Sequence, residues 1–114
     1  MLRSLAESQM AGSIFQTVGA TLQANTTYTL KLSVGHRADE AFTGYVATLL
    51  AGSVAVAYDD SLNPAAGTFV EDTITYTTGA TPALRGQLLA ISIRSVGTGQ
   101  VNIANVALTY SPAP

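Results

Sequence analysis

Six of the seven acidic residues form three adjacent pairs: Asp39 and Glu40, Asp59 and Asp60, and Glu71 and Asp72. Carboxylate oxygens on loops are the hard ligands that Ca²⁺ prefers. Because the second pair opens a polar loop, we predict a calcium site built from Asp59, Asp60 and loop carbonyl groups, with solvated turn residues as the alternative. The third pair lies in a predicted strand, whose alternation sends its two side chains to opposite faces. No other cofactor is predicted.

His36 is the single histidine and a candidate general base, because Asp39 or Glu40 could orient its ring. An ordinary polar loop residue is the alternative interpretation. With no cysteine and no second histidine, a zinc or other transition-metal site has too few ligands. No Gly-x-Ser-x-Gly elbow marks a nucleophile, and no carboxylate pair is marked for glycoside hydrolysis. We therefore predict no catalytic residue from the sequence alone.

Aromatic residues near two of the loops suggest a binding site. Phe42 lies in a predicted loop, where strand alternation does not explain an apolar ring, and Tyr58 precedes the Asp59 loop. Exposed rings of this kind stack on sugar faces, and core or interface packing is the alternative. The residues that we predict to contact a ligand are His36, Arg37, Phe42, Tyr45 and Tyr58.

Short strands must hold these loops in place. In residues 27–34, apolar side chains alternate strictly with polar ones, which is typical of a half-buried antiparallel strand. Gly52 suits a tight hairpin between two strands, and a slip in the apolar phase of the last strand predicts a β-bulge near Ala104 and Asn105. The other predicted strands are residues 13–18, 45–50, 54–58, 69–77, 88–94 and 101–110. This spacing predicts an all-β fold, an antiparallel β-sandwich or jelly roll of about seven strands.

Length and composition restrict the function further. The 114 residues suit one domain, which we place at residues 13–114 behind an N-terminal extension of residues 1–12. A net charge of -2 with scattered basic residues argues against nucleic-acid binding. No run of 18 apolar residues is present, and the first ten residues lack the apolar stretch of a signal peptide. We therefore expect no membrane span.

Several stretches carry a resemblance to known proteins: residues 13–17, 22–30, 34–37, 42–45, 49–52, 67–69 and 101–106. In their order and spacing they resemble bacterial jelly-roll domains of the galactose-binding-like, carbohydrate-binding-module-like kind, found in secreted proteins with PEP-CTERM sorting signals. The resemblance implies an extracellular or periplasmic location. The same domain type is similar to the calcium-dependent Stig cyclases, which rearrange and cyclise an isonitrile-bearing indole through acid catalysis by an aspartate.

The chain departs from the cyclase pattern in its last strand. That pattern reads Phe-Asp-Asn-Val, whereas this chain has Ile103, Ala104, Asn105 and Val106, so the acidic position is Ala104. Family members also have further strands ahead of residue 13. A shortened jelly roll would leave a sheet edge or part of the core uncovered, so we expect a homodimer or a higher homo-oligomer.

Residues and resemblance together predict a non-catalytic carbohydrate-binding module that recognises a glycan or polysaccharide through loop aromatics and polar side chains. One alternative is a small Stig-cyclase-like or lyase-like enzyme that uses Asp39, Glu40 or His36 as its acid. A structural or adhesive assembly module is the other. Ala104 counts against the enzyme, and the absence of Trp counts against a strong lectin.

Overall fold

The computed structural model describes residues 3–5, 8–10, 13–39, 41–97 and 99–113. Seven of the strands are long, and two have three residues each. Their bounds are β1 (Arg3–Leu5), β2 (Ser8–Met10), β3 (Ser13–Thr21), β4 (Thr26–Gly35), β5 (Tyr45–Ala51), β6 (Val54–Asp59), β7 (Phe69–Thr77), β8 (Leu88–Ser95) and β9 (Val101–Pro112). The predicted strands are all present, and the largest difference is at the end of β3, which runs to Thr21.

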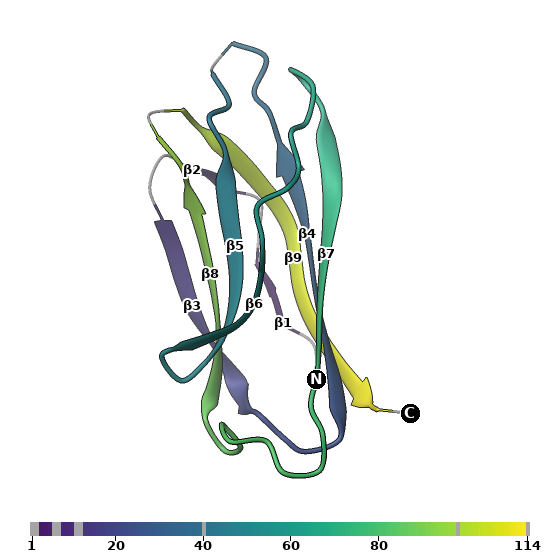
Figure 1. The fold of residues 1–114 in the computed structure, drawn as a ribbon. Helices are drawn as coiled ribbons and strands as arrows, with labels where there is room; N and C mark the ends of the chain where they lie inside the picture. The colour runs from purple at the N-terminus through teal and green to yellow at the C-terminus, as the bar shows by residue number, and fades with distance from the viewer. Residues whose placement is uncertain (1–2, 6–7, 11–12, 40, 98, 114) are drawn as a thin grey trace.

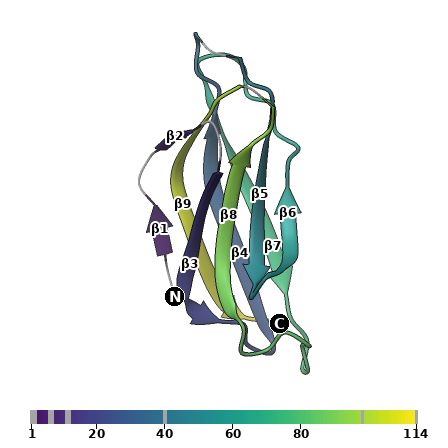
Figure 2. The ribbon, with the colours of Figure 1, turned by 90° about the vertical axis from the view of Figure 1, so that its left-hand side faces the viewer.

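The strands form two antiparallel sheets packed face to face (Figure 1). Sheet A has the order β1-β9-β4-β7, and β2 also pairs with β9. Sheet B has the order β3-β8-β5-β6 and lies in front of sheet A when the molecule is turned by 90° (Figure 2). The predicted all-β sandwich of about seven strands is therefore confirmed. In the segment expected as an N-terminal extension, β1 and β2 pair with β9.

Strand alternation builds the core between the sheets. Every second residue of β4 is buried, including Leu30 and Val34, and β5 repeats the pattern with Ala47 and Leu49. The intervening side chains point away from the core. Most of the core side chains are aliphatic, and the two tyrosines among the fully buried residues are Tyr28 and Tyr45. In the part of the chain that the structure describes, no helix is long and apolar enough to cross a membrane.

Two predicted irregularities are present. Gly52 turns the β5–β6 hairpin with a φ of 62°. In β9, Asn105 has a φ of 55°, and the register with β4 shifts between Lys31 and Ser33. An extra residue with positive φ is what a β-bulge needs to absorb the slip in apolar phase, so the bulge predicted at Ala104 and Asn105 is confirmed.

The loops after β4, β6 and β8 lie together at one end of the sandwich (Figure 1). Backbone hydrogen bonds join them: the amide of His36 donates to Thr68, and the amide of Gly67 donates back to His36. Gln100 likewise donates to Ala41 in the first of these loops. Sequence segments that are far apart therefore form one connected loop layer over the end of the core.

Candidate functional site

The loop layer brings several predicted ligand contacts together. The ring centroid of His36 lies 5.4 Å from that of Phe42, and the Phe42 centroid lies 6.3 Å from that of Tyr45. Nδ1 of His36 is 2.9 Å from the carbonyl oxygen of Pro64. Phe42 is partly buried and packs against the core. The ring of Phe42 therefore joins the β4–β5 loop to the interior rather than standing free in solvent.

Tyr45 begins β5 with its side chain inside the sandwich, only 1% exposed. The phenol hydroxyl donates to Oδ2 of Asp72 at 2.6 Å, and Oδ2 of Asp59 is 3.2 Å away. The backbone amide of Leu62 donates to the same hydroxyl at 3.2 Å. Burial and the bond to Asp72 raise the pKa of Tyr45 well above its ordinary value. We call Tyr45, Asp59 and Asp72 the acid cluster.

Asp72 is the buried member of this cluster, with an exposed fraction of 4%. It lies on β7 opposite Leu32 of β4 and points into the core, whereas Glu71 is exposed. Burial raises the pKa of Asp72 to about 6; the Tyr45 hydrogen bond opposes this rise, and the bond and charge of Asp59 add to it. At neutral pH part of the Asp72 population therefore keeps its proton.

Asp59 lies at the end of β6, and its pKa is lowered where that of Asp72 is raised. Burial alone would raise its pKa, but hydrogen bonds from Asp72, Ser61 and Tyr45 together bring that pKa below its ordinary value. With the pKa of Asp72 raised and that of Asp59 lowered, Asp72 is the member of the pair that keeps a proton to higher pH. Their environments thus assign one carboxyl as the acid and the other as the base.

A pocket of about 290 Å³ lies beside the acid cluster in the loop layer. Ser61 connects the two, because it is a lining residue of the pocket and its hydroxyl donates to Oδ2 of Asp59 at 2.9 Å. Leu62 lines the pocket too, and its amide bonds Tyr45. The lining residues of this loop pocket are Phe42, Thr43, Gly44, Asp60, Ser61, Leu62 and Asn63. An apolar ring, hydroxyls and a nearby proton donor therefore meet in one place.

Several other residues that the sequence suggested for binding or catalysis lie away from the acid cluster. Tyr58 is 66% exposed and pairs with Thr48 on the outer face of sheet B, away from the loop pocket. Arg37 forms an ion pair with Asp39, with Nε 2.6 Å from Oδ1. Glu40 lies outside the described residues. Neither Tyr58 nor the Arg37 pair is brought to the acid cluster.

The predicted calcium ligands Asp59 and Asp60 lie at the end of β6 and at the start of the loop that follows it. Asp60 is exposed, and Oδ2 of Asp59 accepts a hydrogen bond from Ser61 and lies 3.2 Å from the Tyr45 hydroxyl. Among the described residues, no group of three or more Asp, Glu, His or Cys side chains could hold a metal ion. Ca²⁺ takes six to eight oxygen ligands. Asp59 and Asp60 supply two carboxylates at this position, and the calcium site that they would form with loop carbonyl groups stays a prediction.

Ala104, at the acidic position of the cyclase pattern, lies on β9 of sheet A. It is 7% exposed and lines a recess of about 260 Å³ on the outer face of sheet A, with Ser33, Phe69 and Asn105. None of these four residues is acidic, so this recess has no proton donor of its own. Asp72 shares the strand phase of the apolar residues Ile74 and Tyr76, which is a sequence signal of an inward-facing side chain.

Comparisons with known proteins identify relatives. The model of the HpiC1-like family, described as HpiC1 cyclase, matches residues 2–109. A cyclase from Fischerella sp. TAU, in complex with 4-(1H-indol-3-yl)butan-2-one, superposes with a TM-score of 0.81 at 32% identity over 90% of this chain and 59% of the cyclase. A second match is the Stig cyclase Fisc from Fischerella sp. TAU, in complex with (3Z)-3-(1-methyl-2-pyrrolidinylidene)-3H-indole. Its TM-score and sequence identity are the same, and the match covers 90% of this chain and 58% of the Fisc chain. The chain thus spans less than two thirds of these cyclases. No curated protein sequence matches it.

These findings correct the predicted function. The expectation of a galactose-binding-like, carbohydrate-binding module of the PEP-CTERM type with a glycan partner is wrong, because the matching family and structures are cyclases with indole ligands. The physical reason is that Tyr45 and Phe42 pack inward and form no exposed stacking platform. The similarity to Stig cyclases is confirmed. With a family match over almost its whole length, the chain belongs to the HpiC1-like family of cyclases.

Proposed function

We propose that this chain acts as a small cyclase-like enzyme on an indole-bearing molecule bound in the loop pocket, with the acid cluster as its proton source. Family membership supports the reaction class, and the indole compounds bound by the Fischerella cyclases support the substrate class. The observation that carries the proposal is the carboxyl pair of Asp72 and Asp59, bridged by Tyr45 beside an open pocket.

The pKa of Asp72 suits general acid catalysis. An acid works best when its pKa lies near the working pH, and a pKa of about 6 meets this condition. An exposed aspartate, with a pKa near 3.9, would have lost its proton. Burial between the sheets therefore turns an ordinary carboxyl into a proton store.

The proton reaches the substrate through neighbours, because Asp72 does not line the pocket. Oδ2 of Asp59 and Oδ2 of Asp72 both lie within hydrogen-bond distance of the Tyr45 hydroxyl. Ser61 lines the pocket, and its hydroxyl hydrogen-bonds Asp59. When Asp59 takes the proton from Asp72, the Ser61 hydroxyl turns to accept it and donates its own proton to the substrate. A proton passed along this path to a carbon–carbon double bond leaves a carbocation on the substrate. The electron-rich indole ring attacks the cation, and the proton that the ring loses restores the acid. The net reaction is an isomerisation that needs no co-reactant.

The other acids suggested by the sequence are placed less well. Asp39 is exposed and paired with Arg37, and His36 is held against Pro64. The recess on sheet A has Ala104 where the cyclase pattern has an aspartate, so it lacks that carboxyl group. Of the carboxyls that the structure describes, the pair in the acid cluster is the one that combines burial, a retained proton and a path to a pocket.

A direct test compares Asp72→Asn with the wild-type protein and with Asp39→Asn, which removes an exposed carboxylate as the matched control. The substrate is an indole with an alkene side chain, and isomeric products are separated by liquid chromatography and detected by mass spectrometry. We expect Asp72→Asn to lower turnover about a hundredfold or more, because general acid catalysis contributes at least that factor. Asp39→Asn keeps turnover within about twofold, because the residue is exposed.

Two additional measurements complete this test. Thermal unfolding of both variants checks that each is folded, and assays with added Ca²⁺ and with EDTA measure the calcium dependence that the family resemblance implies. Full turnover by a folded Asp72→Asn variant would show that the acid cluster is not the proton source.

A further inference from the structure

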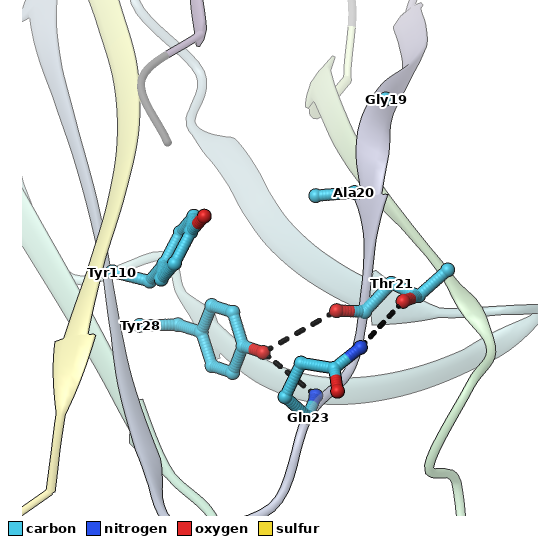
Figure 3. Close-up of a pocket in the computed structure, with 6 residues that line it drawn as sticks. All are labelled: Gly19, Ala20, Thr21, Gln23, Tyr28 and Tyr110. Atoms are coloured by element: carbon cyan, nitrogen blue, oxygen red, sulfur yellow. Dashed lines mark hydrogen bonds between the residues drawn. The ribbon is translucent and has the colours of Figure 1, made fainter.

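A second cavity lies at the opposite end of the sandwich from the loop layer. Its volume is about 420 Å³, larger than that of the loop pocket. It opens between β3 of sheet B and the strands β4 and β9 of sheet A (Figure 3). We call it the tyrosine pocket, after two of its lining residues: Gly19, Ala20, Thr21, Gln23, Tyr28 and Tyr110.

Two tyrosine rings form one wall. Tyr28 is buried and fixed, because its hydroxyl accepts a hydrogen bond from the amide of Gln23 at 2.8 Å and donates to the carbonyl of Thr21 at 3.4 Å. Tyr110 is 47% exposed, with its ring centroid 6.0 Å from that of Tyr28 and the planes tilted by 43°. The wall therefore has an immobile inner ring and an outer ring with a face free for contact.

The opposite wall is open because of an irregularity in β3. The register of β3 with β8 is interrupted between Thr17 and Thr21. Gly19 lies within this interruption, and a Cβ added there would meet nothing within 4 Å. Figure 3 shows the methyl group of Ala20 pointing toward the tyrosine side of the cavity. Small side chains at these two positions keep the space unfilled.

The polar groups of the pocket are neutral and oriented. Nε2 of Gln23 donates to Oγ1 of Thr21 at 2.7 Å, which fixes the plane of the amide (Figure 3). The carbonyl oxygen of the same amide can accept a hydrogen bond. Among the described residues that line the pocket, none carries a charged side chain. A ligand therefore meets aromatic surface and a neutral amide.

We propose that the tyrosine pocket binds a small, planar, neutral molecule that presents an N–H or O–H donor to Gln23 and a flat face to Tyr110. Its volume falls in the range of small-molecule sites, which are mostly apolar with a few placed polar groups. Stacking on the exposed ring contributes the attraction, and the amide gives orientation. This site is separate from the acid cluster and does not depend on the proposed function.

Indole is the probe, and 1-methylindole, which lacks the N–H donor, is its matched control. Binding to the full chain is followed by amide chemical shifts in ¹H–¹⁵N spectra during a titration. We expect saturable shifts at Gly19, Thr21 and Gln23, with 1-methylindole binding several-fold more weakly. Tyr110→Ala weakens binding of indole about tenfold, the factor that corresponds to a lost aromatic contact. Tyr110→Phe keeps the ring and the affinity.

A variant that fills the cavity gives an independent check. Ala20→Leu adds three carbons to a side chain that points into the space and should abolish the shifts at Gly19 and Gln23. Thermal unfolding confirms that each variant is folded. Shifts confined to the loop pocket, at Thr43 and Ser61, would overturn this proposal while supporting the proposed function. Unchanged affinity in both Tyr110→Ala and Ala20→Leu would also overturn it.

Discussion

At the scale of single residues, Asp72 shows how a carboxyl can be buried between two sheets. Taking a charge out of water is costly unless it is neutralised or well paired. Tyr45 and Asp59 both bond the Asp72 side chain, and the raised pKa lets Asp72 stay partly protonated instead of charged. Tyr45 needs its partners in turn, because a buried phenol hydroxyl must also be satisfied. The three side chains therefore support one another.

The raised pKa of Asp72 makes the folding stability of the protein decrease as the pH rises. The pKa of Asp72 rises from 3.8 to about 6 on folding, so the folded state binds more protons than the unfolded state between these values. Stability from this group is fully present below about pH 4 and is lost as the pH rises through 6. We expect Asp72→Asn to gain stability relative to wild type by up to about 3 kcal/mol between pH 4 and pH 7.

Urea unfolding of the wild type and of Asp72→Asn across this pH range measures the difference in their unfolding free energies. Groups that titrate in the same way in both proteins do not contribute to that difference. Asp39→Asn is the control, because it removes a carboxylate that lies outside the acid cluster. Asp59 acts in the opposite direction, since its lowered pKa contributes stability that is lost at acid pH. A constant difference between wild type and Asp72→Asn would show that Asp72 is not protonated on folding.

At the scale of elements, the bulge in β9 keeps both halves of a twelve-residue strand in phase with the core. Ile103 and Val106 are both buried although they are three residues apart, which strict alternation does not allow. Asn105 takes up the extra residue in a left-handed conformation with a φ of 55°. Asn tolerates this conformation better than other residues with a side chain do.

Substitutions at Asn105 test this account. A β-branched residue is strained at positive φ, so Asn105→Val should cost about 1–2 kcal/mol of unfolding free energy. Asn105→Gly, which adopts this conformation freely, should change it by less than about 0.5 kcal/mol. Denaturant unfolding at pH 7 measures both values. Equal destabilisation by the two substitutions would mean that the side chain of Asn105, and not its backbone conformation, matters here.

Local patterns explain why the long strands and the bulge could be predicted. The alternation in residues 27–34 and the phase slip near Ala104 are both properties of adjacent residues. Asp72 could not be assigned in this way, because its partner Tyr45 comes from β5 of the other sheet, 27 positions away. Strand order and the packing of β6 beside β7 decide that contact, and neither is written in a local pattern.

At the scale of the whole molecule, the two ends of the sandwich have different chemistry. The loop layer holds the carboxyl pair, whereas the far end holds an uncharged pocket with two tyrosines. On the outer face of sheet B, Phe15 and Tyr58 are 62% and 66% exposed. The homo-oligomer expected from the sequence stays a prediction. The two proposals therefore predict that substitutions at one end of the sandwich leave the function of the other end unchanged.

The measurement that tests the central claim most directly is the pH dependence of turnover in the wild type and in Asp72→Asn. If Asp72 supplies the proton, wild-type turnover falls as the pH rises through about 6, because the carboxyl loses its proton there. The residual turnover of Asp72→Asn should lack this decrease, and Asp39→Asn should retain it. A decrease of the same size and midpoint in a folded Asp72→Asn variant would contradict the account.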